Sequence, residues 1–175
     1  MAENKKIIKV TLEVREIVFD VMNKTHLTGV NRIAEGSKNY EVAANIQASE
    51  EEEHSYQIKR SISDAFSELK LELGEFLDED DRAATNLIKN EIDLNGKLIL
   101  SFLLPSNFNQ SACNSLSAGL HEYIVSKTIA EWFLITNKDD AADYTALAVQ
   151  ALAQTKQALY KRCRPKRPTY GISKV

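Results

Sequence analysis

Proline and glycine are scarce in this chain, and their distribution restricts the folds open to it. The 175 residues include only three prolines and six glycines, with none of either between Ser37 and Leu73. Sandwiches and barrels built from many short strands depend on these residues at their turns. A long stretch without them can instead form long helices, whose interiors exclude proline. The sequence therefore predicts a mainly α fold, a helical bundle.

The composition indicates one globular domain. Hydrophobic residues make up 43% of the chain and charged residues 27%, and this length can bury a core without metals or disulfides. The two cysteines, Cys113 and Cys163, show no CxxC spacing and no neighbouring histidines, which argues against a zinc site or a redox motif. We expect a soluble, intracellular protein, because the sequence lacks a signal-peptide pattern and any run of eighteen apolar residues.

The first helix is expected to begin near residue 11. From Thr11, a possible N-cap, apolar residues recur mostly at three- and four-residue steps, which places them on one helical face. They are Leu12, Val14, Ile17, Val18, Val21 and Met22. The sequence THLTG at residues 25–29 then ends the predicted helix, with Gly29 available for a left-handed cap.

A second helix is predicted to follow a capping box made by Ser49 and Glu52. Its apolar face comprises Ile58, Ile62, Ala65, Phe66, Leu69, Leu73 and Phe76. A capping box can also lie unused inside a continuous helix, so the sequence leaves open whether residues 38–48 belong to this helix. We favour a break near Ala48.

A β-hairpin is expected between about residues 86 and 104. Two apolar runs flank Asn95 and Gly96, the residue pair that best tolerates a type I′ turn, and the hairpin ends at Pro105. A lone two-stranded hairpin is marginal in water, so it must pack on helices or join strands from another subunit. We therefore expect Asn95 and Gly96 to mark an assembly element.

Two further helices are predicted in the second half. Residues 110–136 start with one apolar stripe and become apolar on most sides, which indicates a central helix or one at an interface. Residues 139–162 should form the last helix, which Pro165 stops. Its inward face comprises Ala141, Tyr144, Ala148, Ala151, Leu152, Thr155 and Leu159.

The charge is divided unevenly along the chain. Residues 161–175 contain six of the 22 basic residues and none of the 25 acidic ones, so the preceding residues carry 16 basic residues and a net charge near −9. We divide the chain into a helical domain, residues 1–163, and a basic extension, residues 164–175. The extension should meet an acidic protein surface, the body of a neighbouring copy or nucleic-acid phosphates. A solvated terminus is the remaining interpretation.

We expect the C-terminal segment to act as a docking arm for an acidic protein. Two prolines prevent it from folding back into a helix, and arginine guanidinium groups pair bidentately with carboxylates. Its basic residues are Lys161, Arg162, Arg164, Lys166 and Arg167, and Tyr170 and Ile172 are the apolar anchors beyond them.

No residue pattern in the chain supports catalysis. The three histidines, His26, His54 and His121, are scattered, and Glu51 with His54 gives one Glu-x-x-His where a di-iron bundle needs two. Neither a GxSxG nucleophile motif nor a glycine-rich nucleotide loop is present. The acidic run at residues 78–81 is expected to be a solvated loop, because calcium loops space their ligands around a glycine. We expect no enzymatic activity, metal or cofactor.

The second half resembles proteins of tailed bacteriophages. The segments LPSNFN, LHEYIVSKTIAEWF, DDAADY and LYKRCRPKRP follow the predicted hairpin in this order, within about residues 86–168. They are similar in residue type to proteins from phages and prophages of Bacteroides-type hosts, among them the head–tail connector proteins, small helical adaptors that assemble beneath the portal. The long acidic second helix and the hairpin depart from the smallest adaptors, which leaves the position in the neck open.

The resemblance implies a structural virion protein of the neck or tail, assembled in the host cytoplasm. Such adaptors pack into a twelve-fold ring that links the portal to the tail and encloses DNA without reading its sequence. A β element lines or joins the ring, and a C-terminal extension grips the portal. By this similarity, the basic residues between 161 and 167 would lie on that extension.

Two other functions remain open. A nucleic-acid-binding packaging accessory protein would use the basic extension on phosphates, and its affinity would fall steeply with salt. A bundle that binds a metal or a small molecule would need converging polar groups, for which the single Glu-x-x-His is the only sign.

Overall fold

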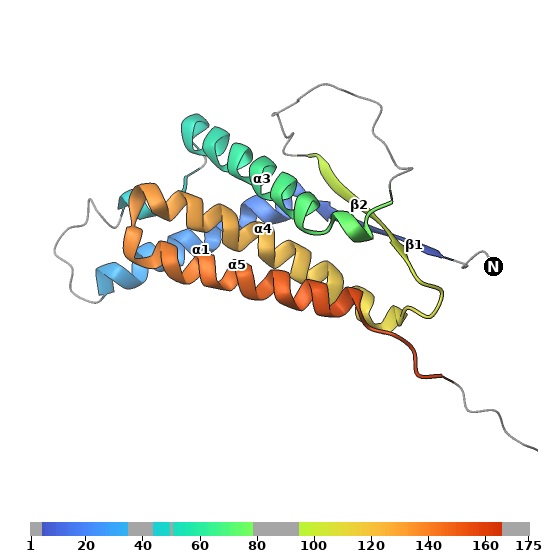
Figure 1. Cartoon of the computed structure of the whole chain (residues 1–175). Helices are drawn as coiled ribbons and strands as arrows, with labels where there is room; N and C mark the ends of the chain where they lie inside the picture. The colour runs from blue at the N-terminus through green and yellow to red at the C-terminus, as the bar shows by residue number, and fades with distance from the viewer. Residues whose placement is uncertain (1–4, 35–43, 50, 79–94, 166–175) are drawn as a thin grey trace, which may run out of the picture.

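Helices and one two-stranded sheet make up the described part of the structure (Figure 1). The computed structural model describes residues 5–34, 44–49, 51–78 and 95–165. In these ranges the elements are β1 (Lys6–Glu13), α1 (Val14–Ala34), α3 (Glu52–Glu72), β2 (Lys97–Leu104), α4 (Cys113–Thr136) and α5 (Lys138–Leu159), with short 3-10 helices at Gly74–Phe76 and Gln110–Ala112. The fold is mainly α with one antiparallel pair of strands, which confirms the predicted fold class. No helix in the described ranges has an apolar stretch long enough to cross a membrane.

Helix α4 occupies the centre of the bundle. It packs along α5 and also contacts α3 and α1 (Figure 1). Its buried residues lie on most sides of the helix and not on one stripe; they are Leu116, Gly119, Leu120, Tyr123, Ile124, Val125, Ser126, Thr128, Ile129, Ala130, Trp132 and Phe133. The prediction of a central helix within residues 110–136 is therefore confirmed.

Helices α4 and α5 approach each other closely at Gly119. A Cβ atom at this position would overlap the Oγ1 atom of Thr155. Thr155 is fully buried, and its hydroxyl donates to the Ala151 carbonyl over 2.8 Å. The predicted inward face of α5 is largely confirmed: Ala141, Ala148, Ala151, Thr155 and Leu159 are buried, while Tyr144 and Leu152 are partly buried against the core.

Residues 6–13 form a strand and not the start of a helix. β1 pairs with β2 in antiparallel register, with pairs running from Lys6–Leu104 to Glu13–Lys97. Val10 and Leu12 are buried, whereas Thr11, which was predicted to cap a helix, lies opposite Ile99. The spacing of apolar residues predicted a helix here because the partner strand, β2, lies far away in the sequence.

Helix α1 continues through residues 25–29, where the sequence predicted its end. Thr25 is fully buried, and its hydroxyl donates to the Val21 carbonyl over 2.9 Å within the helix. The same hydroxyl oxygen accepts a hydrogen bond from the Ala48 N–H over 3.3 Å. Packing of α1 on α4 therefore overrides the local preference of Thr28 and Gly29 for a turn.

The expected hairpin is only partly within the described residues. Its second strand is β2, but its first strand, residues 86–94, lies outside them, and the described partner of β2 is β1. Asn95 and Gly96 lead into β2, and the Gly96 carbonyl accepts a hydrogen bond from the Val14 N–H over 3.1 Å. The two residues therefore lie opposite the junction of β1 and α1, a position that local turn preference does not reveal.

The start of α3 differs from the predicted capping box. Glu51 is the N-cap and makes no side-chain capping hydrogen bond. The Ser49 hydroxyl lies 2.8 Å from His54 Nδ1 and accepts from the Glu51 N–H over 3.4 Å. Residues 44–46 form a separate helical turn, so the predicted break near Ala48 is confirmed.

The close approach at Gly119 generates a stability prediction. Gly119→Ala should lower the free energy of unfolding, because overpacking against Thr155 costs about 1–3 kcal/mol and outweighs the gain of up to about 1 kcal/mol in helix propensity. Urea unfolding followed by circular dichroism measures this change.

A matched double substitution separates the two effects. Thr155→Ala removes the overlapping oxygen, so Gly119→Ala introduced into that background should be neutral or stabilising. An equal loss in both backgrounds would mean that the contact between Gly119 and Thr155 does not limit the helix spacing.

Candidate docking site

The basic C-terminal segment starts on the body of the protein. The Asn109 N–H donates to the Lys161 carbonyl over 3.2 Å, and the Cys163 N–H donates to the Asn107 carbonyl over 2.8 Å. Arg162 forms an isolated β-bridge with Phe108, which is fully buried. Residues 161–163 are therefore fixed to the loop that precedes α4.

Helix α5 ends at Leu159, six residues before the proline that was predicted to stop it. The Arg162 guanidinium donates to the Leu159 carbonyl over 2.7 Å and to the Lys161 carbonyl over 3.3 Å. It thus satisfies the Leu159 carbonyl, one of the groups that the end of a helix leaves without partners. In this structure Arg162 uses its Nη1 to cap α5, and the pairing of Arg162 with an acidic partner stays a prediction.

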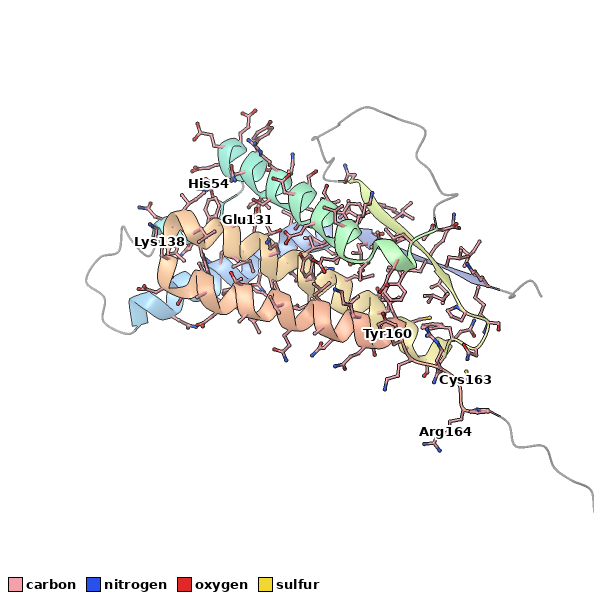
Figure 2. The ribbon with its side chains drawn as sticks, in the orientation of Figure 1. His54, Glu131, Lys138, Tyr160, Cys163 and Arg164 are labelled. Carbon is pink, nitrogen blue, oxygen red and sulfur yellow. The ribbon has the colours of Figure 1, made fainter. Side chains whose placement is uncertain are left out.

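The other predicted docking residues divide into two groups. Lys161 and Arg164 are exposed, and Figure 2 shows Arg164 beyond the end of α5, away from the bundle. Lys166, Arg167, Tyr170 and Ile172 lie outside the described residues. The structure therefore fixes the base of the arm and shows the direction in which it leaves.

A groove runs along α4 beside the base of this arm. One hollow of about 820 Å³ lies between α4 and α5, and a second of about 490 Å³ lies between α4 and the β1–α1 junction. Both hollows are lined by Ala118 and Glu122, so they share a floor. We call this surface the α4 groove; its floor consists of Ser111, Asn114, Ser115, Ser117, Ala118 and Glu122, and Lys161 and Asn109 line one end.

The α4 groove was not predicted from the sequence. Its signal is the run of small and polar residues SACNSLSAG at the start of the predicted central helix, where the following turns are almost wholly apolar. A helix buried on most sides for most of its length but small and polar at one end leaves space at that end. The sequence alone did not show which elements border this space.

Charged pairs line the side of the groove that α1 forms. Glu122 accepts from Lys24 Nζ over 2.8 Å, and the Asp20 carboxylate lies 2.8 Å from His121 Nε2. Glu16 also lines the groove, and within the described ranges it has no ion-pair partner. Glu16 is therefore the groove carboxylate left for a basic partner, since Glu122 on the floor is paired with Lys24, and Asp20, which lies next to the groove, is 2.8 Å from His121.

A second acidic surface, on α3, is already engaged by the protein's own side chains. Lys127 lies 2.9 Å from a Glu68 oxygen, Lys156 lies 2.7 Å from Glu72, and the Tyr160 hydroxyl donates to Glu75 over 3.0 Å. These contacts join α3 to α4 and to the end of α5. They leave this surface less suited to a basic partner than the α4 groove.

Burial beneath α3 shifts two titratable groups. Burial, together with the smaller effects of the Glu68 and Glu72 charges, raises the pKa of Tyr123 to about 12. Burial also raises the pKa of Glu131, against the opposing effect of a hydrogen bond with Ser61. Both groups lie along the packed seam between α3 and α4, so their shifts report on burial and not on chemistry.

The Glu-x-x-His sequence has a structural explanation. The His54 ring packs edge-on against Trp132 with 4.9 Å between ring centroids, and its Nδ1 lies 2.8 Å from the Ser49 hydroxyl. Trp132 in turn donates to the Ile46 carbonyl over 2.9 Å. These contacts hold the segment before α3 on the end of α4. In the described part of the chain, no three His, Cys, Asp or Glu side chains gather as metal ligands would.

Comparison with known proteins identifies no relative, since no family model, curated protein or solved structure matches this chain.

The pKa of Tyr123 predicts weaker folding at alkaline pH. Because its folded pKa of about 12 exceeds the ordinary value of 10.0, the associated stability is complete below pH 10.0 and is lost as the pH rises towards 12. Tyr123→Phe should flatten this decline in the free energy of unfolding. Urea unfolding between about pH 8 and pH 11 tests it, with exposed Tyr56→Phe as the control. An unchanged slope in Tyr123→Phe would contradict the assignment.

The two arginines at the base of the arm should differ in their effect on stability. Arg162→Ala should lower the free energy of unfolding by about 0.5–1.5 kcal/mol, because the Leu159 carbonyl at the end of α5 loses this donor. Arg164→Ala removes the same charge from an exposed side chain and should leave the free energy unchanged. Equal effects of the two substitutions in urea unfolding would show that Arg162 does not cap the helix.

Proposed function

We propose that this protein is a structural virion subunit, a head–tail connector that joins a ring between the portal and the tail. The observation that carries the proposal is the basic arm, which is fixed at residues 161–163 and leaves the body beside the α4 groove. A contact between the arm of one copy and the groove of the next joins two different surfaces, so it is a head-to-tail interface, the kind that generates a ring when the rotation between copies closes. The role is one of assembly and not of catalysis.

Exposed apolar side chains on two helices also support an assembly role. Phe19, Leu27 and Val30 are exposed on α1 at spacings that place them on the same side of the helix. Leu147 and Val149 are exposed on α5, and residues 144–155 of that helix include no charged side chain. Outer faces of this kind are typical of surfaces that other subunits cover.

The charge of the body suits a protein that surrounds DNA without gripping it. Residues 1–160 carry a net charge near −9, which repels phosphates, whereas all of the basic excess lies in the arm. A packaging accessory protein that binds DNA through the arm is the second candidate, and salt-dependent DNA binding would favour it. The hypothesis of a ring enclosing DNA needs the arm to bind protein.

Assembly of the purified chain tests this proposal. Native mass spectrometry and negative-stain imaging should show rings of many copies, formed by the chain alone or on portal rings of the phage or prophage that encodes it. A chain that stays monomeric and ignores portal rings would contradict the proposal.

Removal of the arm tests its part in attachment. A chain that ends at Cys163 keeps the described contacts of residues 161–163, so it should remain helical by circular dichroism but no longer attach to the portal or to a ring neighbour. Unchanged attachment would show that the arm is a solvated terminus. Loss of DNA binding, with attachment to the portal retained, would favour the accessory role.

A further inference from the structure

The strand β1 has one edge that no described strand occupies. The described sheet has only the order β1–β2, so β1 lies at its edge. Across the sheet, residues 77 and 78 border β2: Leu77 forms a bridge with Phe102, and the Asp78 N–H donates to the Ser101 carbonyl over 2.9 Å. Eight-residue edge strands with apolar side chains are ready templates for pairing with another chain.

Two hydrogen bonds establish which backbone groups of β1 point to this open edge. The Val14 N–H donates to the Gly96 carbonyl, and this pair continues the register of β1 and β2. Ser101, which lies opposite Lys9 of β1, instead accepts from the Asp78 N–H with its carbonyl, on the side of β2 away from β1. In an antiparallel ladder, hydrogen-bonded and non-hydrogen-bonded pairs alternate. The even-numbered residues of β1 therefore bond to β2, and the odd-numbered residues, including Ile7 and Thr11, direct their N–H and C=O groups outwards.

The open edge of β1 borders the α4 groove. Thr11 and Leu12 line the hollow of about 490 Å³ together with Asn114, Ser117 and Ala118 of α4. An extended chain lying there would have a row of backbone donors and acceptors beside it and small side chains beneath it. This combination is the geometry of recognition by strand addition.

We propose that residues 169–175 of a second copy of this chain add as a strand to β1 in the α4 groove. The proposal rests on the proposed function of the arm in docking. The seven residues after Pro168, TYGISKV, all carry an N–H group, and a strand of that length spans about 23 Å against about 26 Å for β1. Tyr170 and Ile172, two residues apart, would face the same side, towards the small side chains of α4.

Charge complementarity favours this occupant. The arm brings Arg164, Lys166 and Arg167 ahead of the added strand, and Glu16 of α1, which has no ion-pair partner within the described ranges, lines the groove. Guanidinium groups pair well with such carboxylates. The alternative acidic surface, on α3, has Glu68 and Glu72 already paired with lysines.

The direction of the arm favours exchange between copies over folding back. The last described backbone contact of the arm with the body is made by Cys163, and Arg164 lies beyond the end of α5 (Figure 2). Pro165 and Pro168 stiffen the segment that follows. Because Arg164 points away from the bundle and the groove lies along α4, a return of the same arm into its own groove would need the chain to reverse its direction after Arg164.

Photo-crosslinking in the full chain tests where the arm binds. A benzophenone amino acid at position 170, in an equal mixture of unlabelled and ¹⁵N-labelled chains, should give crosslinks to residues 114–118 that join one light and one heavy peptide. Crosslinks within single chains only, or crosslinks elsewhere, would overturn the proposal. This experiment contains only the chain itself and no portal. The arm could therefore bind a portal even if no crosslinks join two copies, so failure of strand addition is distinguishable from failure of the proposed connector function.

A proline substitution at the open edge tests strand addition directly. Thr11→Pro removes an N–H that points away from β2, so the sheet should persist while self-association measured by sedimentation velocity weakens about tenfold or more. Thr11→Ala keeps the N–H and should associate like the native chain. Equal association of both variants would overturn the backbone pairing.

A second pair of variants keeps the test valid if Thr11→Pro does not fold. Ala118→Glu places a charge on the exposed floor of the groove, and Ala153→Glu places the same charge on an exposed position of α5 that lines neither hollow. Only Ala118→Glu should abolish the crosslink from position 170. A crosslink that persists in both variants would overturn the assignment of the groove.

Discussion

The burial of α4 on nearly all sides is the constraint on which the rest of this structure depends. A helix with apolar residues around most of its surface needs several partners, and here α1, α3 and α5 all pack against it. The close approach of Gly119 to Thr155 sets the spacing of α4 and α5. Where the apolar character of α4 ends, at its first turns, coverage also ends, and the α4 groove lies there. The core and the candidate docking site are thus two consequences of one helix sequence.

The sheet adds a second constraint, because two strands alone are marginal in water. β1 and β2 bury Val10, Leu12, Leu100 and Phe102 against the helices, which stabilises the inner face. No described residues stabilise the outer edge of β1 in this way. An incoming strand would complete the backbone pairing of β1 and cover the small side chains of α4 at once. The same arrangement would couple folding of the subunit to its assembly.

The sequence predicted those elements whose structure depends on local periodicity, and it did not predict those that depend on partners distant in the sequence. The central helix and the inward face of α5 were predicted because the spacing of their apolar residues indicates which positions are buried. Thr11 was assigned to a helix because its true partner, Ile99, lies far along the chain. The capping of Leu159 by Arg162 was missed because the sequence shows the charge of Arg162 but not the direction of its side chain. The α4 groove was missed because the elements that border it are apart in the sequence.

Amide hydrogen exchange at Thr11 tests the central claim, that the arm of one copy completes the sheet of the next. The N–H of Thr11 faces the open edge, so it should exchange quickly in dilute protein and become protected as the concentration rises. The protection should vanish in the chain that ends at Cys163, while the amides of Val10 and Leu12, which bond to β2, stay protected throughout. Fast exchange at Thr11 at every concentration, in protein that nevertheless forms rings, would contradict the account.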